Sequence, residues 1–459
     1  MTLLSAFLAI VEDWQPIFPQ PRSFRRALRQ ALGSLVCLGR RTLSRVIWAN
    51  GGEQKSWSAE YFLHSRCAWE PQRLFEPILK RALPYCPGRY VGVAVDETRL
   101  RKTGRCIQQA FYQRDPLSPP FHCNLMLGVR FLQASLLVPL YRRASVGSRA
   151  LPIRFQEVSA VKRPRRRAPQ VEWQNYRAAV KKHNLSQRFV SLAREIRAAF
   201  DALGDARQIV VLAADGSFCN RTVFTQPVPG VELIVRARKD AQLCFAAPPT
   251  SRRFYSPDKF TPEQVRQDAD RNWQTAKVFY GGQRRQIRYK EVRAVLWQGG
   301  ARRRLLRLLV VAPTPYRKRK SGRLYYRQPA YLLTTVLRGH TRELLQIYFD
   351  RWQIEVNHRE EKDTLGVGQA QLWNPISVPK QPVLAVAAYS ALLLASLQTF
   401  GAERGQAYAP LPKWRRKARR PSCLDLVTLL RKEMMEKPEL VTPLGLNPTY
   451  KTLASGAAA

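Results

Sequence analysis

The sequence predicts an α/β fold, in which a mixed sheet with flanking helices is interrupted by a β-rich insertion. Short apolar runs rich in Val, Ile and Leu, typical of buried strands, occur at 90–100, 208–218 and 231–238. Helical periodicity precedes and follows these runs. An aromatic, Arg-rich and Pro-containing stretch with several short strand candidates occupies 239–329, and it predicts the insertion.

The N-terminal region, 1–85, is predicted to be helical. A basic periodic segment covers 25–50 and stops at an Asn-Gly-Gly sequence that suits a helix C-cap. A second helical stretch covers 58–83 and is expected to break at Pro71. Two basic helices around a Gly turn are typical of a helix-turn-helix DNA-binding unit, and equally of a plain helical bundle.

The predicted core continues with two strand-like runs, 122–131 and 134–141, which we expect to form an antiparallel meander. A helical stretch follows over 173–203. A further core strand at 330–336 precedes a helix over 341–364, whose first turn Thr341 is placed to cap.

The C-terminal region contains the most apolar stretch of the chain, 383–400, which we interpret as a buried core helix because five polar residues interrupt it. A small amphipathic helix is expected near 423–436. The predicted organisation has five parts: a helical region at 1–85, which is the candidate DNA-binding unit, the first part of the mixed-sheet core at 86–238, the insertion at 239–329, the second part of the core at 330–405, and a basic region with a possible dimer contact at 406–459.

Charge indicates the class of partner. The 459 residues include 77 Lys and Arg against 33 Asp and Glu, a formal charge of +44, which favours a nucleic acid as partner. A hydrophobic content of 45% argues against simple basic disorder. Eight dispersed Cys without a CxxC pair, and only five His, argue against structural zinc and favour reduced cytosolic thiols. Basic runs at 162–167 and 316–323 supply candidate phosphate contacts: Arg163, Arg165, Arg166, Arg317 and Lys318.

Two acids follow predicted buried strands. Asp96 ends VGVAVD and Asp215 ends IVVLAAD. Side by side, such strands would place two carboxylates within reach of one Mg²⁺, which prefers hard oxygen ligands. An acid after a strand is also ordinary turn chemistry. Glu97 is expected to point to the opposite face from Asp96, so it is not counted as a ligand.

The predicted helix over 341–364 carries four polar residues on one face. Tyr348, Arg351, Glu355 and Lys362 have offsets of 0, 3, 7 and 14, which at about 100° per residue fall within an arc of about 60°. The stripe suits a phosphodiester site, in which cations hold phosphates and the carboxylate helps to hold a metal ion. A solvated face with an i,i+4 ion pair between Arg351 and Glu355 is the alternative.

This spacing, Y-x2-R-x3-E-x6-K, resembles the signature of the DDE transposases of bacterial insertion sequences, the IS-four or YREK group and its close relatives. The order of Asp96, Asp215, an insertion and Glu355 is similar to the RNase H-like catalytic core of that family, and the resemblance covers about 90–365 well. It implies that these three carboxylates are the catalytic triad and bind two Mg²⁺ ions, for which Mn²⁺ can substitute. It further assigns DNA phosphates to Tyr348, Arg351 and Lys362.

The resemblance implies a cut-and-paste DNA transposase of the bacterial cytoplasm and nucleoid. Such an enzyme binds terminal inverted repeats, cleaves transposon ends and joins the 3′-hydroxyl ends to target DNA. It is expected to act on double-stranded DNA as a homodimer, with no membrane and no nucleotide cofactor, since Gly366-Val367-Gly368 lacks the GK[ST] of a nucleotide-binding loop. A catalytically inactive transposon-derived DNA-binding protein and an RNase H-like nuclease are the alternatives.

Relatives that form a DNA hairpin stack a Trp of the insertion on a flipped base. Trp297 is the first candidate for that role here and Trp273 the second. Packing inside a small β-domain is the alternative for either residue.

Overall fold

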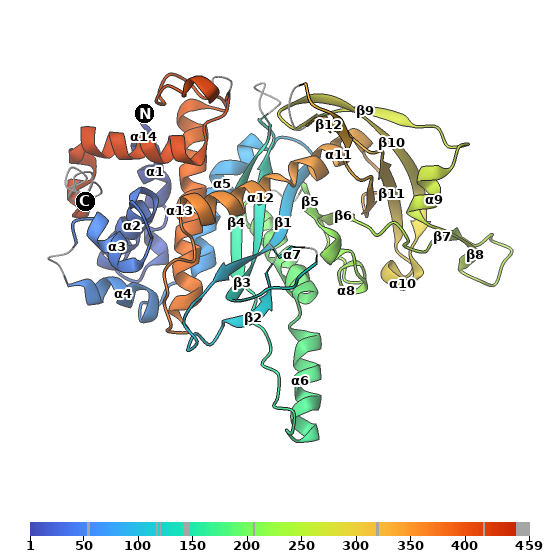
Figure 1. Cartoon of the computed structure of the whole chain (residues 1–459), viewed down its shortest axis with the longest axis horizontal. Coiled ribbons are helices and arrows are strands. Elements are labelled where there is room, and N and C mark those ends of the chain that lie inside the picture. The colour runs from blue at the N-terminus through green and yellow to red at the C-terminus, as the bar shows by residue number, and fades with distance from the viewer. Residues whose placement is uncertain are drawn as a thin grey trace. The chain divides into compact units, whose positions relative to one another are not determined.

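The computed structural model describes residues 1–52, 56–115, 118–119, 121–140, 147–204, 207–317, 321–415 and 418–446 (Figure 1). The chain forms two compact units. We call Met1–Tyr85, Glu97–Lys162 and Ile354–Ala459 the helix-rich unit, and Cys86–Asp96 with Arg163–Gln353 the insertion unit. The five-part organisation expected from the sequence stays a prediction.

The helix-rich unit combines helices with antiparallel strands. Its helices are α1 (Leu3–Glu12), α2 (Pro21–Val36), α3 (Leu43–Ala49), α4 (Trp57–Ser65), α5 (Phe75–Ala82), α12 (Gln353–Arg359), α13 (Ser377–Phe400) and α14 (Cys423–Glu436). Its strands are β2 (Phe111–Arg114), β3 (Leu125–Val138) and β4 (Arg149–Glu157), with β3 paired to both β2 and β4. Strand β1 (Tyr90–Arg101) begins in the insertion unit and ends in this one.

The N-terminal region is helical, as predicted, but its first basic segment is not one helix. Residues between α2 and α3 leave the helical path, and Gly39 among them has φ of 71°. Helix α2 has already ended at its C-cap Cys37, whose ψ of 137° is extended, and Gly adopts the left-handed conformation at position 39 without steric cost. Asn50 is the C-cap of α3, and its backbone N–H donates to the Ile47 and Trp48 carbonyls.

The apolar C-terminal stretch forms α13, which is the central helix of its unit. It packs against α1, α2 and β4. The helix is long and apolar enough to cross a membrane, but 83% of its most apolar window is buried inside the protein. The amphipathic helix predicted near 423–436 is α14, capped by Ser422 and Asp425 in a capping box.

The predicted meander is wrong in one respect, because its two runs form the single long strand β3. The residues between the runs do not turn the chain. Gln133 lies there fully buried and donates a hydrogen bond to Glu361, and a register shift between Ala134 and Ser135 absorbs the irregularity.

The insertion unit is built on a mixed sheet, which confirms the predicted fold class. Neighbouring strands run in the order β1, β5 (Ile209–Ala214), β6 (Val231–Arg236), β14 (Ala330–Thr334), β11 (Leu305–Val311), β10 (Gln283–Leu296), β7 (Leu243–Ala246) and β8 (Tyr255–Phe260), and β9 (Gln274–Tyr280) also pairs with β10. The pairs β1–β5 and β5–β6 are parallel, whereas β14 runs antiparallel to both β6 and β11. A separate hairpin joins β12 (Pro315–Arg317) and β13 (Leu324–Tyr326).

Helices of the insertion unit lie between and around these strands. They are α6 (Gln170–Lys182), α7 (Leu185–Ala202), α8 (Arg221–Phe224), α9 (Pro262–Gln267), α10 (Gln298–Ala301) and α11 (Thr341–Asp350). The helical stretch predicted over 173–203 is therefore two helices. Asn184 separates them, because its side chain accepts the Gln187 amide N–H and caps α7.

Candidate active site

Asp96 and Asp215 occupy equivalent positions on neighbouring strands. The parallel pairing of β1 with β5 ends at Val95 and Ala214, so each carboxylate directly follows its last paired residue. Neighbouring strands lie about 4.8 Å apart, which places the two backbones close together. The prediction that Asp96 ends its strand is wrong, since β1 continues to Arg101.

The continuation of β1 separates Glu97 from this position. Consecutive strand residues point to opposite faces, and the Glu97 carboxylate forms ion pairs with Arg99 and, at 3.4 Å, with Arg130. Both partners belong to the helix-rich unit, like Glu97 itself. The two ion pairs give Glu97 a structural role within the helix-rich unit.

Cationic and phenolic groups surround the two aspartates. The Arg351 guanidinium lies 3.9 Å from the Asp96 carboxylate. Burial raises the pKa of Tyr348, which also feels the positive charges of Arg351 and Arg236 and the negative charge of Asp215. These five residues therefore share one electrostatic environment within the insertion unit.

Arg236 is a member of this group that sequence reasoning missed. The parallel pairing of β5 with β6 ends at Ala214 and Val235, so Arg236 lies level with Asp215 on the next strand. The signal was present, because Arg236 follows the buried run VELIV in the same way that each aspartate follows its own strand.

Asp215 is oriented by its own turn. Its carboxylate accepts the Ser217 amide N–H at 3.0 Å and the Ser217 hydroxyl at 3.1 Å. The residue caps a single 3-10 turn with an extended backbone, φ −81° and ψ −175°. A carboxylate held in this way keeps lone pairs for a further ligand.

The predicted single helix over 341–364 is wrong. Helix α11 is followed by a turn at Arg351 and Trp352, then by α12 and by a π-helical turn at Glu360–Thr364. The Trp352 amide N–H bonds the Phe349 carbonyl, three residues back, where α-helical geometry requires four. The break divides the predicted stripe between Tyr348 and Arg351 in the insertion unit and Glu355 and Lys362 in the helix-rich unit, and their common face stays a prediction.

The π-helical turn is anchored inside the helix-rich unit. Glu361 is 1% exposed, and its carboxyl accepts a hydrogen bond of 3.0 Å from the Gln133 amide. Burial raises the pKa of Glu361 to about 8, outweighing the opposing effects of Gln133 and Lys362. π-turns are rare and often occur at functional sites, and this one contains Lys362.

A second series of hydrogen bonds connects α12 and the π-helical turn to α13. The Tyr389 hydroxyl donates to Glu360, and the Asn357 amide donates to Tyr389 at 3.1 Å and to the Ala150 carbonyl at 3.1 Å. Ser135 donates to the Asn357 carbonyl oxygen at 3.0 Å. All of these side chains are buried, so the polypeptide around Lys362 has a defined position within its unit.

A cavity of about 760 Å³ lies beside Lys362 in the helix-rich unit. Its walls include the apolar residues Leu100, Met126 and Val367, and most of its charged lining residues are cationic. The charged lining residues are Arg40, Arg99, Arg101, Asp115, Arg359, Lys362 and Asp363. A cavity of this character suits an anionic ligand with an apolar part.

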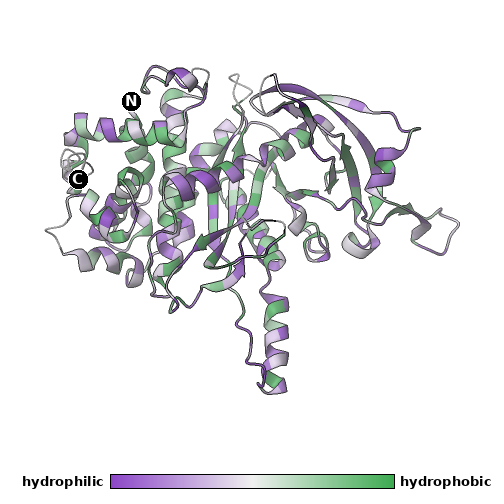
Figure 2. Ribbon diagram, in the orientation of Figure 1, coloured by the Kyte–Doolittle hydropathy of each residue, from purple (hydrophilic) through white to green (hydrophobic). Residues whose placement is uncertain are grey.

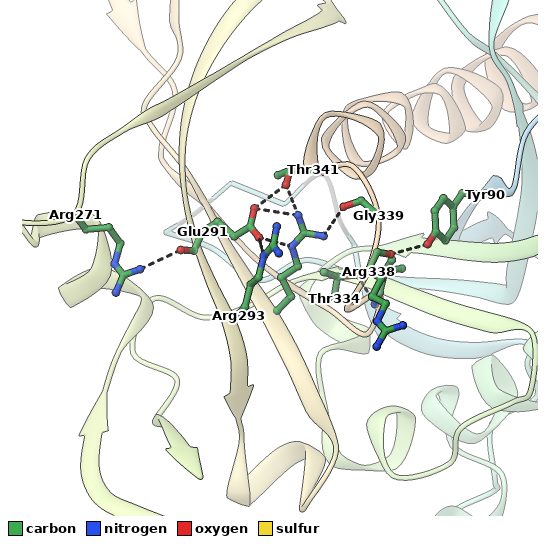
Figure 3. A network of polar contacts seen from close by, with 10 residues as sticks. Tyr90, Arg271, Glu291, Arg293, Thr334, Arg338, Gly339 and Thr341 are labelled. Carbon is green, nitrogen blue, oxygen red and sulfur yellow. Dashed lines mark hydrogen bonds and ion pairs between the residues drawn. The ribbon is translucent and has the colours of Figure 1, made fainter.

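The start of α11 is held by a buried ion pair, shown in Figure 3. The Arg307 guanidinium donates to the Glu291 carboxylate at 2.9 and 3.0 Å and to the Gly339 carbonyl at 3.1 Å. Thr341 donates to Glu291 at 2.6 Å, so it does not cap the helix as predicted; His340 occupies the N-cap without a side-chain bond. This network links β10 and β11 to the helix that carries Tyr348.

The electrostatics of this network favour ionised Glu291. Burial alone would raise the pKa of Glu291, but hydrogen bonds from Arg307, Thr341 and Arg293 together lower it to about 2. Arg307 is fully buried, so each partner compensates a charge that water cannot reach.

The remaining residues predicted to contact DNA are two tryptophans and five basic residues. Trp297 is half-buried and packs edge-on against Phe224 at 5.7 Å, whereas Trp273 lies beneath Lys290 at 4.8 Å. Arg317 is exposed on β12, and Lys318 lies outside the described residues. Exposed side chains also occur at Arg163, Arg165 and Arg166.

The two aspartates suit a hard divalent cation. Asp96 and Asp215 supply carboxylate oxygens, the ligands that Mg²⁺ and Mn²⁺ prefer. Within the residues that the structure describes, no group of three or more His, Cys, Asp or Glu side chains is arranged to hold a metal ion. The two aspartates fit part of such a site, and Glu355 is the predicted third ligand.

Comparison with known families agrees with this geometry. A family model described as DDE superfamily endonuclease matches residues 15–304. The chain belongs to this superfamily. The match contains Asp96 and Asp215 and ends before Glu355. A search among curated proteins found no match.

Membership confirms the family-level resemblance seen in the sequence. Membership of this superfamily supports a nuclease-type enzyme and implies a DNA substrate. DDE nucleases generally use divalent metal ions, in accord with the paired carboxylates of Asp96 and Asp215.

Proposed function

We propose that this DDE endonuclease is the transposase of an insertion sequence. It binds terminal inverted repeats, cleaves at transposon ends and joins the 3′-hydroxyl ends to target DNA as a homodimer on paired ends. The observation that carries the proposal is the pair Asp96 and Asp215 at matched strand positions, with Tyr348 and Arg351 beside them.

In this proposal Asp96, Asp215 and Glu355 hold two Mg²⁺ ions, with Mn²⁺ able to substitute. Bound divalent ions supply Lewis-acid stabilisation of charge on the reacting phosphate oxygens. Basic side chains of the protein position the DNA phosphates. Arg351 and Arg236 bind phosphate oxygens near the aspartates, and Lys362 binds a further phosphate of the transposon end.

Tyr348 has a steering role in the same proposal. A phenol is protonated at neutral pH, and burial raises the pKa of Tyr348 further, so the hydroxyl can donate a hydrogen bond to a phosphate. A neutral donor beside Arg351 orients the phosphate without adding negative charge to a site that already contains two carboxylates.

The test uses duplexes made from the DNA that flanks the gene, incubated with the full chain and Mg²⁺. We expect cleavage with free 3′-hydroxyl ends and their joining to a target plasmid. Asp96→Asn and Glu355→Gln should retain end binding and lose both reactions, because an amide is a poor metal ligand. The matched control is Asp240→Asn, an exposed carboxylate of the insertion unit, which should stay fully active.

The outcomes separate the alternative functions. Cleavage without joining would identify a nuclease, and end binding without cleavage would identify a DNA-binding protein that has lost its chemistry. Cleavage by Asp96→Asn at the wild-type rate would remove Asp96 from the site.

A further inference from the structure

Helix α6 lacks the packing that stabilises the other long helices. Its thirteen residues include none that is buried, and Pro169 at its N-cap makes no side-chain capping bond. An isolated helix of this length is only marginally stable in water, so tertiary or partner contacts normally support it. Figure 1 shows α6 projecting away from α7 and from the sheet of the insertion unit.

The segment is strongly basic. We call residues 163–183 the basic arm. It contains seven Lys and Arg against the single acid Glu172. The cations are Arg163, Arg165, Arg166, Arg167, Arg177, Lys181 and Lys182, and all seven are exposed. Charge complementarity therefore favours a polyanion as the partner of this surface.

One side of α6 is partly covered by the arm itself. Trp173 and Tyr176 make an edge-to-face contact at 6.0 Å, and the Arg163 guanidinium lies 5.4 Å from the Trp173 ring. Both aromatic residues are half-buried. The loop before the helix thus folds back on this aromatic side and leaves the other sides to solvent.

An exposed stripe runs along the helix beside the aromatic side. Gln170, Gln174, Arg177 and Lys181 have offsets of 0, 4, 7 and 11, which at about 100° per residue fall within an arc of about 60°. Figure 2 shows hydrophilic residues alternating with hydrophobic ones along α6, as expected for a helix with such a stripe.

The stripe matches the dimensions and chemistry of a DNA major groove. Eleven residues rise about 16 Å, the length of about five base pairs, and a helix of about 10–12 Å diameter fits a groove about 12 Å wide. Gln pairs with adenine and Arg with guanine through two hydrogen bonds each. The loop arginines would then lie at the N-terminal end of the helix, where phosphates flank the groove.

We propose that α6 is a sequence-reading helix that enters the major groove of duplex DNA, with Gln170, Gln174 and Arg177 on base edges. Arg165, Arg166 and Lys181 contact phosphates. The inference rests on the DNA substrate in the proposed function, and it assigns base recognition to an element outside the N-terminal helices that the sequence suggested.

The test selects duplexes from a library with a randomised centre, using the full chain without divalent metal, so that the readout is independent of cleavage. We expect the wild type to enrich a motif. Gln174→Ala/Arg177→Ala should bind that motif about ten-fold more weakly or worse, and its preference over random duplex should collapse. The matched control, Asn175→Ala/Lys182→Ala, removes one amide and one cation away from the stripe and should keep the preference.

Hydrogen exchange gives a second readout on the same samples. Amides of residues 170–182 should become protected when the enriched duplex is added. Circular dichroism should show both double variants folded, since α6 has no buried residue. Absence of an enriched motif, equal loss of preference in both double variants, or unchanged preference in Gln174→Ala/Arg177→Ala would each overturn the inference.

Discussion

Glu361 is predicted to make the stability of the helix-rich unit fall as pH rises. Burial sets its folded pKa at about 8, against 4.5 for an ordinary glutamate. The folded state therefore binds the proton more tightly than the unfolded state does. The contribution of Glu361 to the free energy of unfolding is fully present below pH 4.5. It declines between pH 4.5 and 8 and is lost above that range.

The magnitude follows from the same two values. A shift of about 3.5 units at about 1.4 kcal/mol per unit gives an upper limit of about 5 kcal/mol. Glu361→Gln resembles the protonated acid and removes this pH dependence. We expect the variant and the wild type to be similar near pH 5, with the variant more stable by several kcal/mol at pH 8.

The assay is urea unfolding followed by circular dichroism at a series of pH values. Glu436→Gln, an exposed glutamate of α14 in the same unit, serves as the control and should follow the wild-type profile. A difference between Glu361→Gln and the wild type that stays constant from pH 5 to 8 would refute the reasoning, because Glu361 would then be ionised or solvated in the fold.

Two further predictions concern the insertion unit. Glu291→Ala leaves the Arg307 charge buried and unpaired, so it should cost about 3–5 kcal/mol in thermal unfolding, and Glu291→Ala/Arg307→Met should recover part of that loss; a double variant no more stable than the single one would contradict this. Arg302 has φ of 51° at an exposed position, so Arg302→Gly should stabilise by about 1 kcal/mol and Arg302→Ala should not, as measured by melting temperature.

The sequence predicted the local elements and the chemical class of the site because these depend on neighbouring residues. Apolar runs predicted strand β1, which contains Asp96, and strand β5, which precedes Asp215, and the pairing of the two strands agrees with the side-by-side arrangement expected. Helix α14 and the β-rich character of 239–329 were likewise readable from periodicity and composition. The resemblance carried by the polar spacing around Tyr348 agrees with the DDE superfamily to which the chain belongs.

Helix continuity could not be read from the sequence in the same way. Ideal periodicity extends past Arg351, yet the chain turns there and later forms a π-turn around Lys362. The π-turn contains buried Glu361, whose partner Gln133 is 228 positions away in the chain. A pattern over a few turns carries no information about such a partner.

What the sequence by itself determined is the charge, the strand and helix segments, and the set of carboxylates and cations available for phosphoryl transfer. What only the tertiary structure decided is which of these groups meet. Arg236 joins Asp215 because β6 pairs in parallel with β5, and Thr341 binds Glu291 where the sequence had favoured a cap. The physical reason is that strand pairing and burial act between residues distant in sequence, and they outweigh the local preferences of about 1 kcal/mol that a sequence pattern expresses.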